Sequence, residues 1–231
     1  MNGINDVVDF HTHILPGIDH GCDSLQTARE QLRLAGAVGV SRVVLTPHFY
    51  PHVDNIESFI KRRNEAYDQL VSSLSSDDYP EVRLGTEVLI CEGIGEMPRI
   101  DEFCIRGTKN LLLELPFSDF SKGYVDGVEQ LISSGYNVIL AHADRYDQNN
   151  IDKLVSIGAK VQLNAEALAG LFISSKVRSW LDSGCVCAIG SDIHMLDRSA
   201  YGCFKLARKR IFKKYGAVVA ASNKIWSDSK K

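Results

Sequence analysis

The chain has 231 residues, of which 45% are hydrophobic and 24% charged, an ordinary composition for a globular protein with a substantial core. Its formal charge of −3 gives no general attraction to nucleic acid or anionic lipid, so neither a nucleic-acid partner nor membrane insertion is expected. No apolar run approaches the length of a membrane span, and the first residues lack the basic-then-apolar pattern of a secretion signal.

Alternating apolar runs and amphipathic stretches predict strand–helix units repeated seven times along the chain, which is typical of a parallel sheet. The expected strands cover residues 7–10, 41–46, 82–90, 110–116, 136–141, 159–164 and 185–190. The expected helices cover about 23–38, 55–74, 95–103, 119–134, 150–157, 166–183 and 198–215. No linker divides residues 1–231, so we expect a single domain with its core over about 6–216 and a flexible tail at 227–231.

The first expected strand leads into a histidine-rich segment. His11 and His13 are one residue apart on an extended backbone, so their side chains share a face and can converge on one point. His20 follows closely and can reach the same point. A lone histidine is more often a core or loop residue, but this spacing favours a metal site.

Side chains of the same chemistry recur within or just after five of the six other expected strands. They are His48, Glu87, Glu114, His142, Asp192 and His194. The carboxyl ends of all strands meet at one face of a (β/α) barrel, whereas an open doubly wound sheet gathers only the central ones. The distribution therefore favours an α/β fold of the closed, TIM-like barrel type.

The carboxylates indicate what this face binds. Glu87 and Glu114 lie in otherwise apolar runs, where an unpaired buried carboxylate is costly and a cation removes that cost. A salt bridge to a buried Arg or Lys is the alternative, although these strands offer few basic residues. Eight or nine N and O ligands exceed what one ion holds, so we expect two or three divalent ions, with Mn²⁺, Fe or Zn²⁺ as the candidates.

Cysteine does not contribute to this ligand set. Cys185-x-Cys187 lacks a second pair, so we interpret both as core thiols rather than as half of a metal site. The six scattered cysteines favour a reducing, cytoplasmic location.

Arg145 lies in the loop after the fifth expected strand, on the same face as the metal-type residues. A guanidinium beside a metal cluster suits an anionic oxygen substrate such as phosphate, although an ion pair with Asp144 or Asp147 is the alternative interpretation. Arg198 is a second candidate for substrate binding. The chain has neither a Walker-type loop nor a Gly-x-Ser-x-Gly motif, so metal-activated water is the expected nucleophile.

Taken together, these motifs resemble the PHP (polymerase and histidinol phosphatase) superfamily. Within it the chain is similar to the manganese-dependent bacterial protein-tyrosine phosphatases of capsule and exopolysaccharide loci. The similarity covers about residues 6–212. It rests on Asp9–Asp19, Thr46-Pro-His48, Gly85-Thr-Glu87, Leu113-Glu-Leu-Pro116, His142-Ala-Asp-Arg145 and Gly190-Ser-Asp-Ile-His194.

The resemblance implies a distorted (β/α)₇ barrel with three metal ions, manganese first among the candidates, and hydrolysis of phosphotyrosine on a protein. The implied substrate is a bacterial tyrosine kinase of a polysaccharide locus, and Arg145 takes the place of the phosphate-binding arginine. The implied ligands are His11, His13, His48, Glu87, Glu114, His142, Asp192 and His194.

Two positions depart from the family pattern. Asp19-His20-Gly21 stands where Asp-Asp-Gly is usual, so His20 is expected as the ninth ligand, with Asp19 as the alternative. A histidine ligand here would shift the metal preference towards Zn²⁺ or Fe. Arg198 follows Asp192 by six residues instead of seven. The alternatives are a PHP phosphoesterase acting on a small metabolite such as histidinol phosphate, and a non-catalytic metal-binding PHP module.

Overall fold

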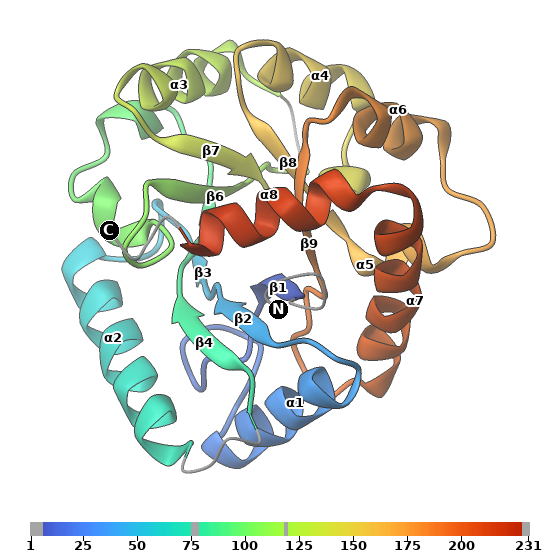
Figure 1. Cartoon of the computed structure of the whole chain (residues 1–231). Coiled ribbons are helices and arrows are strands. Elements are labelled where there is room, and N and C mark those ends of the chain that lie inside the picture. The colour runs from blue at the N-terminus through green and yellow to red at the C-terminus, as the bar shows by residue number, and fades with distance from the viewer. Residues whose placement is uncertain (1–6, 75–78, 118–119, 228–231) are drawn as a thin grey trace.

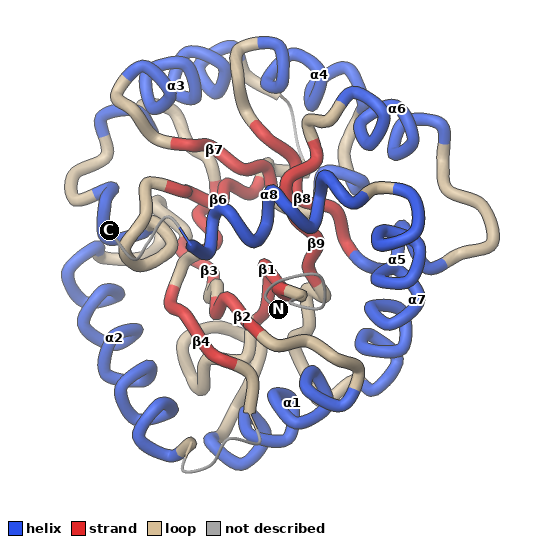
Figure 2. The backbone as a smooth tube through the Cα atoms, viewed as in Figure 1, coloured by secondary structure: helices blue, strands red, loops and turns tan. Residues whose placement is uncertain are grey.

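A barrel of parallel strands surrounded by helices forms the centre of the computed structural model, which describes residues 7–74, 79–117 and 120–227 (Figure 1). The strands are β1 (Val8–Thr12), β2 (Arg42–Leu45), β3 (His48–Phe49), β4 (Glu81–Leu84), β5 (Glu87–Leu89), β6 (Asn110–Glu114), β7 (Asn137–Leu140), β8 (Lys160–Asn164) and β9 (Val186–Gly190). Figure 2 shows them as an inner ring with most of the helices outside it. The predicted α/β, TIM-like fold class is confirmed.

The helices agree with the predicted order but differ in three places. They are α1 (Leu25–Ala37), α2 (Ile56–Ser73), α3 (Lys122–Ser133), α4 (Gln148–Ser156), α5 (Ala165–Ala169), α6 (Ser175–Ser183), α7 (Arg198–Lys214) and α8 (Gly216–Ser227). The prediction of a single helix over 166–183 was wrong, because α5 ends before Gly170 and a separate helix, α6, begins at Ser175. The helix predicted over 95–103 is instead two 3₁₀ turns, η1 (Ile94–Glu96) and η2 (Ile100–Phe103). The third difference, α8, had no predicted counterpart.

Side-chain caps explain where several helices begin. The Ser24 and Asn55 side chains accept hydrogen bonds from the backbone N–H groups of the first turns of α1 and α2. Asp147 and Asp197 do the same for α4 and α7. Such caps each contribute about 1 kcal/mol. The predicted start of α3 at residue 119 lies outside the described residues, as do residues 228–231 of the predicted tail.

One of the seven predicted strands is broken into two, and another is followed by a short strand, β3, that had no predicted counterpart. The strand expected at 41–46 ends at Leu45, and β3 begins after Pro47; the strand expected at 82–90 is interrupted at Gly85 and Thr86. Gly85 N donates to Leu45 O at 2.8 Å and Glu87 N donates to Pro47 O at 3.1 Å, so the ladder continues across both breaks. Because β2 and β4 end before the two breaks and β3 and β5 begin after them, the strands are grouped in two sheets, ordered β1-β2-β4 and β3-β5-β6-β7-β8-β9.

Backbone bonds between the first and last strands close the ring. Asp192 N donates to His11 O at 2.8 Å, and His13 N donates to Ile193 O at 2.9 Å. Ser191 N adds a bond to the Asp9 carboxylate at 2.8 Å. We call this junction the β1–β9 seam.

The inside of the barrel is a small apolar cluster, separate from the larger layer between strands and helices. Phe10, Leu112 and Ile139 point into it, and Trp226 of α8 closes it at the amino ends of the strands. Figure 1 shows α8 lying across the ring. Among the described residues, no helix is both long and apolar enough to cross a membrane.

Candidate metal centre

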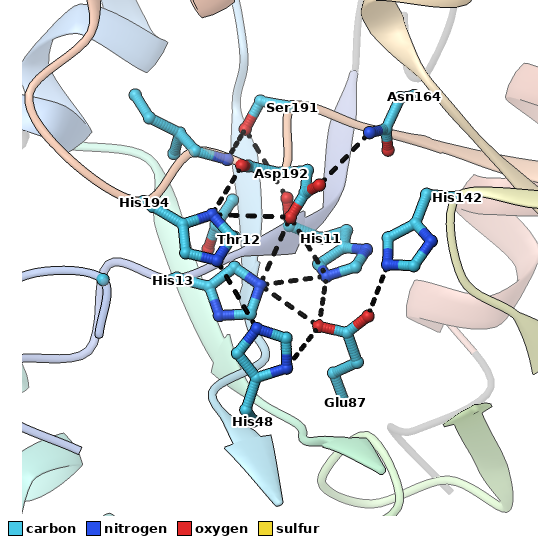
Figure 3. A network of polar contacts seen from close by, with 12 residues as sticks. His11, Thr12, His13, His48, Glu87, His142, Asn164, Ser191, Asp192 and His194 are labelled. Carbon is cyan, nitrogen blue, oxygen red and sulfur yellow. Dashed lines mark hydrogen bonds and ion pairs between the residues drawn. The ribbon is translucent and has the colours of Figure 1, made fainter. Parts of the chain in front are cut away.

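The carboxyl ends of the strands carry a buried cluster of imidazoles and carboxylates, which Figure 3 shows from close by. Glu87, the first residue of β5, lies at its middle. Glu87 Oε2 is 2.9 Å from His11 Nε2, 3.2 Å from His13 Nε2 and 3.1 Å from His48 Nδ1. Its other oxygen is 2.8 Å from His142 Nε2. One carboxylate therefore contacts four imidazoles from three separate parts of the chain.

Two further carboxylates lie on either side of Glu87. Asp192 Oδ1 is 3.3 Å from His13 Nε2 and 3.6 Å from His194 Nδ1. Glu114, at the end of β6, lies 3.5 Å from His48 Nδ1. The site thus extends across the barrel mouth, from β9 to β6.

The ligand atoms form four overlapping groups, each with its atoms within 4.8 Å of one another. The groups are His13/His48/His194, His11/His13/Asp192, His11/Glu87/His142 and His48/Glu87/Glu114. His11, His13, His48 and Glu87 each belong to two groups. The groups therefore adjoin one another, and of the four shared residues Glu87 is a carboxylate, whose two oxygens could bridge neighbouring ions. The structure therefore brings together eight of the nine residues predicted as ligands.

Neighbouring side chains orient the imidazoles for a cation. His11 Nδ1 lies 3.1 Å from Gln162 Oε1, a carbonyl oxygen that accepts its proton, and His13 Nδ1 lies 2.7 Å from Asp19 Oδ2. Both rings thereby direct Nε2 into the centre, and the two Nε2 atoms are 3.1 Å apart. Tying one ring nitrogen to an oxygen while the other faces the ion is the usual arrangement of metal-ligating histidine. The residues present fit divalent ions.

Two ligand-type residues occupy strained backbone conformations. His142 has φ of 29° and Asp192 has φ of 54°, a region that non-glycine residues rarely adopt. Gln162 Oε1 accepts the His142 N–H at 2.6 Å. The backbone bond from Asp192 N to His11 O, part of the β1–β9 seam, holds Asp192 in its conformation. Such strain costs on the order of 1–3 kcal/mol and persists where the surroundings impose it, often at functional sites.

Sequence reasoning missed the residues that support the ligands. Gln162 and Asn164 end β8, and Asn164 Nδ2 donates to Asp192 Oδ2 at 3.2 Å. Asp19 Oδ2 also accepts the His48 N–H at 3.0 Å. One signal was available: two amide side chains one residue apart at the end of an apolar strand repeat the pattern of His11 and His13.

His20 is the predicted ligand that the structure places outside the four groups. Its side chain is exposed, with its ring centroid 4.6 Å from that of His194 and 5.0 Å from that of His48. Its neighbour Asp19, not His20, contacts His13. His20 as a ligand stays a prediction.

Arg145 lies beside the cluster of imidazoles and carboxylates. Its ion-pair partner is Asp192, not Asp144 or Asp147 as the alternative interpretation of the sequence proposed. Its guanidinium is 2.5 Å from Asp192 Oδ2, and its side chain is 42% exposed. It lines a cavity of about 420 Å³ that Asp192, His194 and Met195 also line. Arg198, by contrast, is exposed at the start of α7 and does not line this cavity.

Imidazoles and carboxylates in the cluster shift one another's pKa values and favour the charged forms of Glu87 and His13. Burial alone would raise the pKa of Glu87, but the charge and hydrogen bonds of the surrounding imidazoles, His11 above all, hold it well below its usual range. Burial opposes a charged imidazole, yet Asp19, Asp192 and Glu87 raise the pKa of His13 well above its ordinary value. At neutral pH Glu87 is therefore ionised and His13 holds a proton.

Metal affinity is accordingly expected to rise with pH between 6 and 8. A divalent ion binds the neutral imidazole, so it must displace the proton that the raised pKa of His13 retains. Each displaced proton makes affinity change about tenfold per pH unit, and Glu87 and Asp192 add nothing because their lowered pKa values keep them ionised in this range. Competition titrations with a chelator of known pH dependence measure this slope. Equal affinity at pH 6 and pH 8 would contradict it.

Comparisons with known proteins point in one direction. A profile of the family described as capsular polysaccharide synthesis, CpsB/CapC, matches residues 7–228. The tyrosine-protein phosphatase YwqE of Bacillus subtilis is 30% identical over 173 residues, covering 72% of this chain and 67% of that protein. The putative tyrosine-protein phosphatase CapC of Staphylococcus aureus is 29% identical over 224 residues, covering 90% and 85%.

Solved structures agree. One from a study of YwqE from Bacillus subtilis and CpsB from Streptococcus pneumoniae, described as unique metal-dependent tyrosine phosphatases, superposes with a TM-score of 0.76 at 25% identity and covers 97% of this chain and 93% of that one. The histidinol phosphate phosphatase of Lactococcus lactis, solved with zinc, histidinol and phosphate, has a TM-score of 0.53 at 13% identity, covering 91% and 94%. This second likeness concerns the fold alone.

Proposed function

This chain belongs to the CpsB/CapC family of capsular polysaccharide synthesis, and from that premise we propose that it is a metal-dependent phosphatase that hydrolyses phosphotyrosine on proteins. The observation that carries the proposal is the convergence of eight metal-type side chains, with Glu87 at their middle and the Arg145 guanidinium at their edge. Such a site combines cation binding with a fixed positive group for an oxyanion.

The eight clustered residues are the proposed ligands of two or three divalent ions, with Mn²⁺ first among the candidates and Fe or Zn²⁺ as the others. His20, at the edge of the cluster, is the proposed additional ligand. When bound, such ions supply Lewis acidity and lower the pKa of a coordinated water towards about 7. Gln162 and Asp19 hold the imidazoles in place for this role.

Arg145 is the proposed phosphate-binding residue. Its guanidinium is half-exposed and faces the cavity, so it can donate two parallel hydrogen bonds to phosphate oxygens and stabilise the charge that develops on them. Asp192 fixes its direction. Arg198, which lies between the cavity-lining residues Asp197 and Ser199 but does not itself line the cavity, remains a proposed second contact.

The surroundings of Arg145 favour an aryl phosphate. Phe117 is 75% exposed, and its ring centroid lies 5.5 Å from that of Tyr146, the residue after Arg145. An aromatic pair at this position offers a face on which a tyrosine ring can pack. The leaving group from phosphotyrosine is a phenolate, and the pKa of its phenol is about 10. It therefore needs less protonation by a general acid than the alkoxide that leaves from phosphoserine.

The proposed substrate is a tyrosine kinase of a polysaccharide locus, and the proposed location is the cytoplasm. The six cysteines are all unpaired, as a reducing compartment requires. Dephosphorylation of such a kinase would regulate capsule or exopolysaccharide synthesis.

The test compares substrates and inhibitors on one preparation of known metal content. We expect two to three ions per chain, faster turnover of a phosphotyrosine peptide than of a phosphoserine peptide or histidinol phosphate, and loss of activity in EDTA that Mn²⁺ restores. Alkylation of the thiols with a small reagent should leave activity intact, because burial raises the pKa of Cys104 and of Cys187 to about 12 and no thiol belongs to the four ligand groups. The reagent must be small because Cys203 lines the cavity. Full activity in EDTA would refute the proposal, and faster turnover of histidinol phosphate would replace it with the small-metabolite alternative.

A further inference from the structure

The outer face of α7 carries a concentration of positive charge that the overall charge of −3 conceals. Residues 198–214 contain seven Lys and Arg and no Asp or Glu. Tyr201, Phe204, Ala207 and Ile211 are the buried residues of the helix. On the opposite side, Lys205, Lys209 and Lys213 are exposed at intervals of four and form a single row. We call this row the α7 lysine row.

Helix stability does not account for this row. Like charges four residues apart repel one another along a helix, so the arrangement weakens α7 slightly. Among the described residues, no ion pair involves these lysines. An external anionic partner would offset the repulsion.

Large apolar side chains protrude next to the lysine row. Leu171 and Phe172, in the loop between α5 and α6, are 85% and 83% exposed, and Leu206 of α7 is 52% exposed. Arg210 of α7 fixes this loop by donating to the Leu168 and Gly170 carbonyls, both at 2.7 Å. Figure 1 shows α5 and α7 side by side at the outer edge of the barrel.

A shallow hollow of about 350 Å³ joins the two features. Leu168 and Ala169 of α5 line it together with Leu206, Lys209 and Lys213 of α7. Arg210 also lines the hollow and donates to the Leu171 carbonyl at 3.3 Å, so the lysine row and the apolar loop are neighbouring parts of one surface.

We propose that this surface binds peripherally to a membrane containing anionic lipids. Clustered lysines are attracted to anionic headgroups, each contributing about fivefold in partitioning, and protruding Leu and Phe side chains enter the interface between headgroups and acyl chains. An acidic protein would need a matching concave pocket for Leu171 and Phe172, whereas a bilayer yields to their shape. No spanning segment is involved.

Membrane binding would also position the proposed active site. The first turn of α7 forms part of the active-site cavity through Ser199, Ala200 and Cys203. A protein resting on α7 and the Leu171 loop would hold the cavity mouth close to the bilayer. The site would then face substrates at the membrane.

The experiment is sedimentation of the full chain with vesicles of phosphatidylcholine alone or with about 30% phosphatidylglycerol, at low and high salt. We expect binding only to the anionic vesicles, weakened by salt because the charges are exposed. The K205E/K209E/K213E variant should bind roughly 100-fold more weakly or worse, from the loss of three such contributions. L171S/F172S should weaken binding at both salt concentrations.

A matched control is K61E/K122E/K160E, which makes the same charge change at exposed lysines on other elements and should bind as the wild type does. Turnover of a soluble phosphotyrosine peptide checks that every variant is folded. This check needs no membrane, so it is independent of the vesicle experiment. Failure of the wild type to sediment with anionic vesicles would overturn the proposal, as would equal losses in the control. Binding to polyglutamate without binding to vesicles would replace the lipid surface with an acidic protein.

Discussion

Arg145→Ala is expected to lower kcat/KM for a phosphotyrosine peptide roughly 100-fold or more, while leaving the metal content unchanged. Removal of one preorganised donor that faces developing charge typically costs a factor of about 10² to 10³. Arg145 approaches the ligand groups only through Asp192 Oδ2, whereas the other oxygen of Asp192 faces His13 and His11. The substitution thus removes the phosphate contact and keeps the metal-facing side of the site.

Two further variants make this result specific. Arg145→Lys keeps the positive charge but loses the two-pronged geometry, so it should recover only part of the activity. Arg178→Ala removes an exposed arginine of α6 and should have no effect. An Arg145→Ala enzyme as fast as the wild type would remove this residue from the mechanism. Loss of metal in that variant would show that Arg145 supports the ligands instead.

Glu87→Gln is expected to be the most damaging single substitution. The amide has nearly the same shape but no charge, so the four imidazoles around it lose their shared anion. Removal of a residue that only supports a ligand costs about 10- to 100-fold in metal affinity, and loss of a ligand common to two groups should exceed that. Activity should fall by roughly three orders of magnitude or more for the same reason.

Elemental analysis of the purified variant, together with Mn²⁺ titration followed by thermal unfolding, measures this loss without reference to activity. Wild-type protein should gain thermal stability with Mn²⁺, because an ion that binds only the folded state stabilises it. The Glu87→Gln variant should gain no thermal stability with Mn²⁺. Glu81→Gln, at an exposed position of β4, is the matched control and should behave as the wild type does. A full metal complement in Glu87→Gln would contradict the proposed ligand set.

The sequence alone predicted the barrel and most of the residues that meet at its mouth, for a physical reason. Strand ends in a parallel barrel converge, so polar residues that follow apolar runs, such as His48 and His142, are brought together by topology alone. Positions of buried carboxylates such as Glu87 were equally visible, because an apolar strand does not retain an unpaired charge without compensation.

Other features depended on tertiary contacts that no local pattern records. The sequence of α8 is rich in small apolar residues, and its place is set by Trp226 packing against the barrel interior. Gln162 acts through groups that lie 20 and 151 positions away in the sequence. The strand breaks around Pro47 and Gly85 require knowledge of the neighbouring strand, because the ladder continues across them.

The β1–β9 seam sets an order of events during synthesis. Ser191 and Asp9 are joined although they are 182 positions apart, and the ligand groups likewise combine His11 and His13 with Asp192 and His194. A nascent chain emerging from the ribosome therefore holds the first half of its ligands long before the last. The proposed metal sites can be completed only after the chain has been made through His194, which leaves the early-emerging histidines open to adventitious ions until β9 closes the ring.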